Sequence, residues 1–420
     1  MKAANPINVL RSRNFRLLWV GSIVSSFGTA IGSVVLTWVV FTASHSPLYV
    51  ALLGIVGFLP SVLFGLIAGA LVDRADRRRL MLACDVARFG TLGGLAAYTV
   101  IFGVNLVALL GAALIVATFS TIFRPATNAV VPRLVPGAEL TDSNGLLMAG
   151  TTIAGFVGSP VGGLLVITVG VVGGLLANAL TFGFSGAMIF LMIIPTLAQK
   201  DLATESTRTS LLSEVRQGIR YLWSQKPLLW ITLSGMVANF FLALFFAFTV
   251  IYASVQLRQG AAGFGILLAA GAAGWGFGAI LPGRIGTDRA PALWYAVAWT
   301  MAGLTIVAIG LVRDLPSATL LSLAFGMLGG IGNTTFFAAV QREVPPHLLG
   351  RYFATDEAGS YAMIPAGQVV GGLLILSIGI GTTYVLAGIG AFVCSGLLLL
   401  IPSVRVWGRS KGAERPVSSQ

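Results

Sequence analysis

Charged residues gather in one short stretch between two long apolar runs, and its sequence is Gly69-x-x-x-Asp73-Arg74-x-Asp76-Arg77-Arg78. A carboxylate at a helix end is stabilised when it faces the first turn of another helix, and arginines beside it can pair with acids or with lipid phosphates. Contacts of this kind can form and break, so the stretch predicts a charged gate. The alternative is that these charges only set the orientation of the chain in a membrane.

A second group of charges lies inside apolar sequence. Asp85 and Arg88 are three residues apart and share one face of a predicted helix over 80–102, and Arg124 at the end of a later apolar run could join them. A charge within a bilayer costs about 2.5–3.5 kcal/mol, so these three residues are candidates for proton coupling. The alternative is a structural ion pair. No carboxylate lies near the middle of any apolar run, so coupling uses Asp85 or the gate carboxylates, or the protein does not run on protons.

Helices that span a membrane must position these side chains. The chain is 56% hydrophobic and 10% charged, whereas a soluble domain has about 25% charged residues. Runs of about 20 apolar residues or more, long enough to cross a bilayer, recur near 16–42, 48–72, 80–102, 105–131, 143–169, 171–194, 228–254, 263–283, 292–312, 317–341, 356–378 and 381–402. The sequence therefore predicts an all-α membrane protein with twelve transmembrane helices.

The basic residues are distributed unevenly along these helices. The net charge is +12, and every Lys and Arg except Arg258 and Arg313 falls in the amino terminus, in the even-numbered connections with their flanking helix ends, or in the carboxyl tail. This is the positive-inside pattern, and it predicts a multi-pass protein of the cell membrane with both termini in the cytoplasm. Anionic lipids of the inner leaflet are the expected partners of this charge, and nucleic acid is not, because no basic face lies on a folded module.

The two halves of the chain repeat each other at an offset of 209 residues. The segment 161–165 returns as 370–374, and nine glycines fall on other glycines. The repeat predicts two pseudo-symmetric six-helix bundles over 1–197 and 228–403, followed by a tail over 404–420. In a membrane protein, such halves are typical of a transporter with its substrate site between them.

The predicted linker between the bundles, 198–227, contains an amphipathic pattern. Leu211, Val215, Ile219 and Leu222 recur at helical spacing. They predict a cytoplasmic helix that lies on the membrane surface or against the bundle ends. A passive tether is the alternative.

With twelve spans and an internal repeat around it, the charged stretch over 69–78 resembles the signature of the major facilitator superfamily, G-x-x-x-D-R-x-G-R-R, with Asp76 in place of the usual glycine. The resemblance covers residues 9–403. It implies that the gate closes against helix 11, where Asp356 and Glu357 are the expected partners of Arg77 or Arg78.

Helix 5 is similar to the antiporter motif of proton-coupled exporters in this superfamily, G-x8-G-x3-G-P-x2-G-G. The motif positions here are Gly145, Ala154, Gly158, Ser159, Gly162 and Gly163, with the proline shifted to Pro160. Segments such as Asp85-x-x-Arg88 and Pro125-Ala126 resemble the branch that holds macrolide and enterobactin exporters. These resemblances favour export by antiport.

In this fold, helices 1, 4, 7 and 10 line the central cavity. Their polar and aromatic residues are the candidate substrate contacts: Ser25, Trp38, Thr121, Asn239, Phe245, Asn333 and Phe336. The set suits a hydrophobic or amphiphilic ligand, although the two amides could instead bond between helices.

Other functions lack the residues that they need. The chain has no Gly-Lys-Ser/Thr segment for a nucleotide phosphate, and its two His and two Cys offer neither an enzyme site nor a metal site, so no cofactor is expected. The sequence predicts a secondary active transporter, expected to be a monomer, that couples proton entry to efflux of a small drug-like, macrolide-like or siderophore-like compound by alternating access. The alternatives are uptake by symport and a membrane scaffold without transport.

Overall fold

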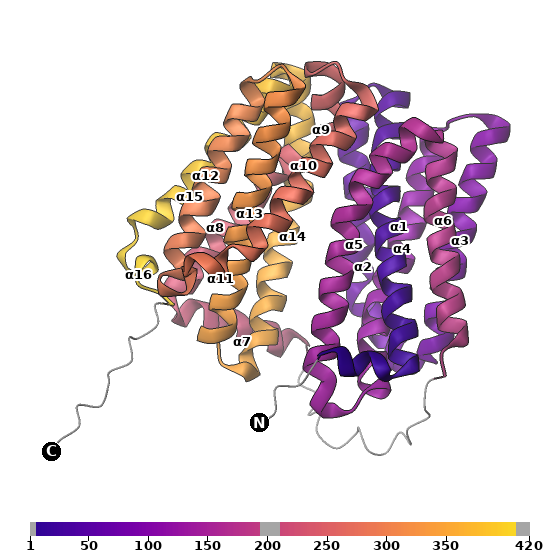
Figure 1. Ribbon diagram of the computed structural model, residues 1–420, viewed down its shortest axis with the longest axis horizontal. Coiled ribbons are helices and arrows are strands. Elements are labelled where there is room, and N and C mark those ends of the chain that lie inside the picture. Colours follow the sequence, from indigo (N-terminus) through magenta and orange to yellow (C-terminus); the bar gives the residue numbers. More distant parts are fainter. Residues whose placement is uncertain (1–5, 194–210, 409–420) are drawn as a thin grey trace. The chain divides into compact units, whose positions relative to one another are not determined.

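The computed structural model describes residues 6–193 and 211–408, and every regular element in these ranges is helical. Among the described residues, twelve helices are long and apolar enough to cross a membrane, which confirms the twelve spans predicted from the sequence. The long helices are α1 (Arg13–Ser44), α2 (Pro47–Arg74), α3 (Arg77–Phe102), α4 (Leu106–Leu134), α5 (Leu140–Thr168), α6 (Gly170–Leu191), α8 (Lys226–Phe246), α10 (Gly260–Ile280), α12 (Pro291–Leu311), α13 (Leu315–Glu343), α14 (Pro346–Ile378) and α15 (Ile380–Leu397) (Figure 1). The short helices are α7 (Leu211–Ser224), α9 (Thr249–Ile251), α11 (Pro282–Ile285) and α16 (Pro402–Arg405).

The chain divides into two compact units. The first comprises Met1–Ser206 and Thr249–Ala269, and the second comprises Thr207–Phe248 and Ala270–Gln420. The segment Thr249–Ala269 belongs to the first unit because it packs there: Ala261 joins the core around Val35 and Leu175. The predicted bundle boundaries at 197 and 228 stay a prediction, and residues 198–210 and 409–420 of the predicted linker and tail lie outside the described residues.

Equivalent pairs of helices, related by the sequence repeat, pack together in the two units. In the first unit α1 packs against α5 and α6, and α3 packs against α4 and α6. In the second unit α8 packs against α14 and α15, and α12 packs against α13 and α15. Each pair in one unit is the sequence repeat of a pair in the other, so the offset found in the sequence corresponds to a repeated packing arrangement.

Repeated glycines explain why the sequence repeat survives at these positions. Gly158 on α5 faces α1, and Gly367, its equivalent at the 209-residue offset, faces α8 on α14. A Cβ atom at Gly158 would lie 2.5 Å from the carbonyl oxygen of Phe27, so only glycine permits the backbones to approach this closely. Gly170, the first residue of α6, and Gly379, the residue before α15, are another equivalent pair, and their φ values of +70° and +80° would strain other residues.

We expect Gly158→Ala to lower the stability of the protein by about 1–3 kcal/mol, because the added methyl group meets backbone that cannot move cheaply. Gly155→Ala is the matched control, since a Cβ atom there meets nothing within 4 Å. The control should leave stability unchanged or raise it by up to about 1 kcal/mol, because alanine favours helix. Thermal unfolding of the purified variants measures both, and equal midpoints would contradict the assigned contact.

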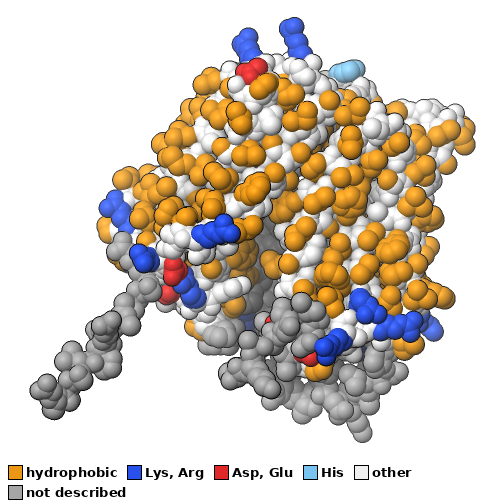
Figure 2. Space-filling view, in the orientation of Figure 1, with side chains coloured by type: hydrophobic (Ala, Val, Ile, Leu, Met, Phe, Trp, Pro, Cys, Tyr) orange, Lys and Arg blue, Asp and Glu red, His pale blue; other side chains and the backbone are white. Residues whose placement is uncertain are grey.

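The outer surface of the helices is apolar, as a bilayer requires. Val62, Leu180 and Leu311 have exposed fractions of 64%, 65% and 68%. Hydrophobic side chains cover the flanks of the helices in Figure 2, and Lys and Arg gather near the helix ends. Exposure of so large an apolar surface to water is unfavourable, so these flanks contact lipid.

The helix α7 packs within the second unit. Its Leu222 is 4% exposed and packs in a core with Val340, Val344 and Tyr352. Arg351 on α14 also donates a hydrogen bond of 2.6 Å from Nη1 to Oε1 of Gln217 on α7. Leu222, one of the apolar residues of the amphipathic pattern predicted in the linker, is therefore buried in a core with residues of α13 and α14.

Candidate coupling and gate sites

Asp85 and Arg88 form an ion pair in the interior of the first unit. The side chains are 0% and 3% exposed, and Nη2 of Arg88 donates to Oδ1 of Asp85. Both residues lie on α3, one turn apart, as their spacing predicts. A buried pair of this kind gains its stability from close geometry and from additional partners, because removing two charges from water is costly.

Aromatic rings on two other helices hold the guanidinium group of Arg88. Its Cζ lies 4.3 Å from the ring centroid of Phe123 on α4 and 4.3 Å from that of Phe182 on α6. Arg88 also donates to the Cys84 carbonyl at 3.4 Å and makes a 3.5 Å contact with the Ser120 hydroxyl. Cation–π contacts strengthen when they are desolvated, so α3, α4 and α6 are tied together at the charge pair.

Sequence reasoning did not identify Phe123 or Phe182. The sequence does place Phe123 directly before Arg124, the residue predicted to join the pair, and the ring of Phe123 on α4 contacts Arg88. Arg124 itself is exposed. Nothing in the sequence distinguishes a phenylalanine that contacts a buried arginine from the many phenylalanines in apolar runs that contact lipid or the core.

The described part of the charged stretch is built around the start of α3. Asp76 accepts a hydrogen bond of 2.9 Å from the backbone N–H of Arg79 and so caps this helix. Aspartate is among the best residues at this position, which explains its presence where the family signature has glycine. Arg77, a predicted gate residue, follows as the first residue of α3.

Arg78 binds the end of α6. Its Nε donates to the carbonyl of Ile189 at 3.1 Å, and its Nη2 donates to the carbonyl of Phe190. Cations are favourable at a helix carboxyl terminus because the last carbonyls lack helical partners. Arg78 therefore joins α3 to α6 within the first unit. The predicted pairing of Asp356 and Glu357 with Arg77 or Arg78 stays a prediction, and the side chains of Asp73, Arg74 and Glu357, with Gly69, lie outside the described residues.

The candidate substrate contacts are distributed over both units. In the first, Ser25 is buried, Trp38 is half-buried, and the Thr121 hydroxyl lies 3.1 Å from that of Ser61. In the second, Asn239 donates to the carbonyl of Gly235 in its own helix at 2.9 Å, and Asn333 is half-buried.

Two aromatic candidates have ring partners in the second unit. The ring of Phe245 lies 5.0 Å from those of Phe325 and Tyr384, and the ring of Phe336 lies 5.3 Å from that of Tyr295. Phe245 is 6% exposed, so it contributes to a packed aromatic cluster.

The glycines of the helix-5 motif make close contacts along α5. Gly158 and Gly162 face α1, and a Cβ atom at Gly163 would lie 2.5 Å from Cα of Gly265 in the first unit. A Cβ atom at Gly145 would meet nothing within 4 Å, and Pro160 lies inside the helix. Most of the motif therefore permits close packing of helix backbones.

Comparison with known proteins identifies the family. A family model of transmembrane secretion effectors matches residues 4–415. The chain belongs to this family. The protein is therefore a transporter of the major facilitator superfamily and not an enzyme, and it is a multi-pass membrane protein of the kind found in the bacterial cell membrane.

The transporter has relatives named as efflux proteins. It is 24% identical over 391 residues to macrolide efflux protein A of Streptococcus pyogenes, with 89% of this chain and 92% of the relative covered. It is 26% identical over 428 aligned positions to the multidrug efflux pump Tap of Mycobacterium tuberculosis, with 96% and 97% covered. The relationship is distant and extends over almost the whole of each protein.

Solved structures support the fold. A bacterial homologue of the human lysosomal transporter Spinster matches with a TM-score of 0.71 at 14% identity, covering 96% of this chain and 99% of that one. The nucleoside transporter NupG matches with a TM-score of 0.69 at 13% identity, covering 92% and 99%. The predicted fold class, twelve helices in the major facilitator fold, is confirmed.

Proposed function

We propose that the transporter exports a small hydrophobic or amphiphilic compound across the cell membrane by alternating access, with proton entry as the driving force. Its distant, full-length relationship to two efflux proteins is the observation that carries the direction of transport. A drug-like, macrolide-like or siderophore-like compound is the proposed cargo. The seven candidate contacts on helices 1, 4, 7 and 10 are proposed to bind it, and both chain termini are assigned to the cytoplasm.

Asp85 is the proposed proton acceptor. Arg88 competes with the proton for the carboxylate group of Asp85. When Asp85 binds a proton, it loses most of its attraction for the guanidinium group of Arg88. That group lies between Phe123 and Phe182, so a shift of Arg88 would act on α4 and α6 at the same time. The pair thus offers a physical route from proton binding to helix movement within the first unit.

The charged stretch is the proposed cytoplasmic gate. Asp73, Arg74 and Arg77 would exchange partners with Asp356 and Glu357 as the gate opens and closes. Arg78 has a different part in this proposal, because its bonds to the carbonyls of Ile189 and Phe190 fix α3 to α6. A gate requires helix ends that are fixed in this way, because charges on a moving helix end would not stay aligned with their partners.

The direction of transport is tested by expression in a bacterial host that lacks its own efflux pumps. We expect expression to raise resistance to at least one member of a panel that contains a macrolide and lipophilic dyes, and to lower the accumulation of that compound in the cells. Increased accumulation across the panel would indicate uptake and would contradict the proposal.

We expect Asp73→Asn to slow export by roughly two- to 30-fold, the range that corresponds to a charge–helix interaction of about 0.5–2 kcal/mol. Asp73 lies in the last turn of α2, where a negative charge is unfavourable to its own helix, so the substitution should leave folding intact. Initial rates of dye export measure the effect.

Asp76→Asn is the matched control for this substitution. It also removes one carboxylate from the stretch, but asparagine caps a helix as well as aspartate does, so the start of α3 is preserved. This control should transport at the normal rate. Equal rates for the normal protein, Asp73→Asn and Asp76→Asn would exclude Asp73 from the gate.

A further inference from the structure

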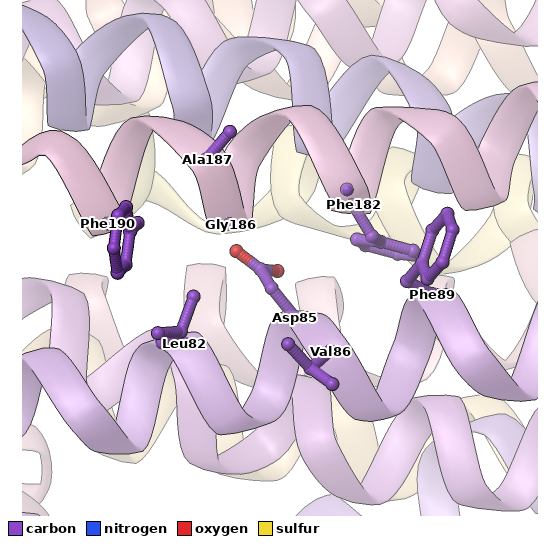
Figure 3. A pocket seen from close by; sticks show the side chains of 9 residues that line it. Leu82, Asp85, Val86, Phe89, Phe182, Gly186, Ala187 and Phe190 are labelled. Carbon is purple, nitrogen blue, oxygen red and sulfur yellow. The ribbon is translucent and has the colours of Figure 1, made fainter.

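A groove of about 240 Å³ runs between α3 and α6 on the apolar flank of the first unit. Val86 and Phe190 on its rim have exposed fractions of 61% and 63%. Phe89 and Phe190 lie at opposite ends of the groove in Figure 3. The side chain of Asp85 at its base is 0% exposed and is paired with Arg88, so the accessible surface of the groove is apolar. We call this feature the α3–α6 groove.

Small residues on α6 keep one wall of the α3–α6 groove low. Gly183 and Gly186 present backbone instead of side chains to α3, and a Cβ atom at Gly183 would lie 3.2 Å from the ring of Phe89. Ala187, which also lines the groove, is exposed. A hydrocarbon chain of the surrounding bilayer can therefore lie in the groove without crossing water.

One end of the α3–α6 groove is bordered by an arginine. Arg79, Leu82, Val86 and Phe89 recur at helical spacing on one face of α3, and the last three line the groove. Arg79 is exposed, so its guanidinium group can reach the headgroup layer. At 1.5 Å per residue, Arg79 and Phe89 are about 15 Å apart along the helix, which is half of the roughly 30 Å hydrocarbon core. The groove and its charged end thus match the depth of one leaflet.

The positive charge at this end is not neutralised by the described part of the protein. Nε and Nη2 of Arg78 donate to the uncharged carbonyl groups of Ile189 and Phe190. Neither Arg78 nor Arg79 has a carboxylate ion-pair partner among the described residues. The segment 76–79 contains three arginines and one aspartate, so positive charge is in excess. A negatively charged phosphate group would supply the missing counter-ion.

We propose that the α3–α6 groove binds one anionic phospholipid, with its phosphate group at Arg78 and Arg79 and an acyl chain in the groove. The volume is below the roughly 300–1,000 Å³ of pockets for drug-sized ligands, so the groove holds part of one chain. A zwitterionic lipid has similar chains but brings a cation of its own to the arginines. The proposal concerns lipid binding and holds whether or not the protein exports a compound.

The bound chain would also protect the buried ion pair. Asp85 lies at the base of the groove, between the two helices in Figure 3. Hydrocarbon over this seam excludes water from the pair on its lipid side, and a charge pair is screened less where water is excluded.

The test places the full chain in phosphatidylcholine nanodiscs that contain a trace of phosphatidylglycerol with a photoactivatable diazirine on its acyl chain. Peptide mass spectrometry then measures the labelling of segments 82–89 and 183–190, and phosphatidylcholine with the same diazirine is compared in separate nanodiscs. We expect phosphatidylglycerol to label these segments roughly five- to 30-fold more strongly, the effect of one or two arginines at the membrane surface. Equal labelling by the two lipids would make the groove an ordinary contact with bulk lipid and would overturn the proposal.

Arg79→Gln tests the contact with the headgroup. We expect it to lower labelling by phosphatidylglycerol about fivefold and to leave labelling by phosphatidylcholine unchanged. Arg289→Gln is the matched control, because Arg289 is also exposed and lies just before α12, the repeat of α3 in the second unit. It removes the same charge away from the groove and should have no effect there. Equal effects of the two substitutions would indicate a general surface charge and would contradict a specific site.

Ala187→Phe tests the position of the acyl chain. The added ring occupies the groove without removing an arginine, so labelling of the groove by phosphatidylglycerol should fall to the level of phosphatidylcholine or below. Ala97→Phe, on an exposed part of α3 outside the groove, should label normally. Normal labelling of the Ala187→Phe protein would place the lipid elsewhere.

Discussion

Replacement of Asp85 alone by leucine should destabilise the protein by about 3–5 kcal/mol, because it leaves the guanidinium group of Arg88 buried without its counter-ion. The double variant Asp85→Leu/Arg88→Met removes both charges, and replacement of a buried ion pair by apolar residues is often neutral or stabilising. We therefore expect the double variant to recover the thermal stability of the normal protein. Thermal unfolding in detergent compares the two.

The double variant also separates the two roles considered for the pair. If the pair couples protons, the double variant is folded but loses export driven by a pH gradient. If the pair is only structural, recovery of folding restores export as well. Ser120→Ala is the control, because its contact with Arg88 is 3.5 Å long and its loss should change stability by less than about 1 kcal/mol. A stable Asp85→Leu single variant would contradict the ion-pair account.

Much of the fold could be predicted because a bilayer imposes simple rules. Each span needs about 20 apolar residues, so the twelve runs in the sequence correspond to twelve helices. The repeat was equally visible, since glycines at close backbone contacts such as Gly158 and Gly367 cannot be replaced without separating the helices. Both signals arise from constraints that act locally on the chain.

Features that depend on tertiary contacts could not be predicted. The sequence placed Asp85 and Arg88 on one helix face, but nothing in it distinguished Phe123 and Phe182 from other phenylalanines in apolar runs. The amide of Asn239 is still expected to bond between helices or to substrate, and the sequence analysis did not predict its hydrogen bond to the carbonyl of Gly235 in its own helix. The end of the seventh span was also unexpected: it contains a π-helical turn over Tyr252–Gln256, in which Leu257 donates to the carbonyl of Tyr252.

Asp76 has a role that the sequence analysis did not assign to it. Against the family signature it is a departure, because glycine is usual there. In the structure it is the N-cap of α3, because it directly precedes the first residue of this helix and accepts a hydrogen bond from the backbone N–H of Arg79.

Loss of the proton gradient should abolish export, which is the largest functional effect expected. One charge crossing about 100 mV provides about 2.3 kcal/mol, enough for a concentration gradient of nearly 50-fold, so proton entry can drive export without ATP. A protonophore should therefore reduce the concentration gradient of the substrate to that of passive leakage. A protein that held its gradient in the presence of the protonophore would require another energy source.

The most direct measurement is flux in proteoliposomes that contain the purified full chain and a radiolabelled compound selected by the resistance panel. Imposed pH gradients of either sign, and a sodium gradient without a pH gradient, are compared in the same preparation. We predict that substrate moves against the proton flow under a pH gradient and does not move under sodium alone. Transport that follows the sodium gradient, or that runs in the same direction as the protons, would contradict proton-driven export.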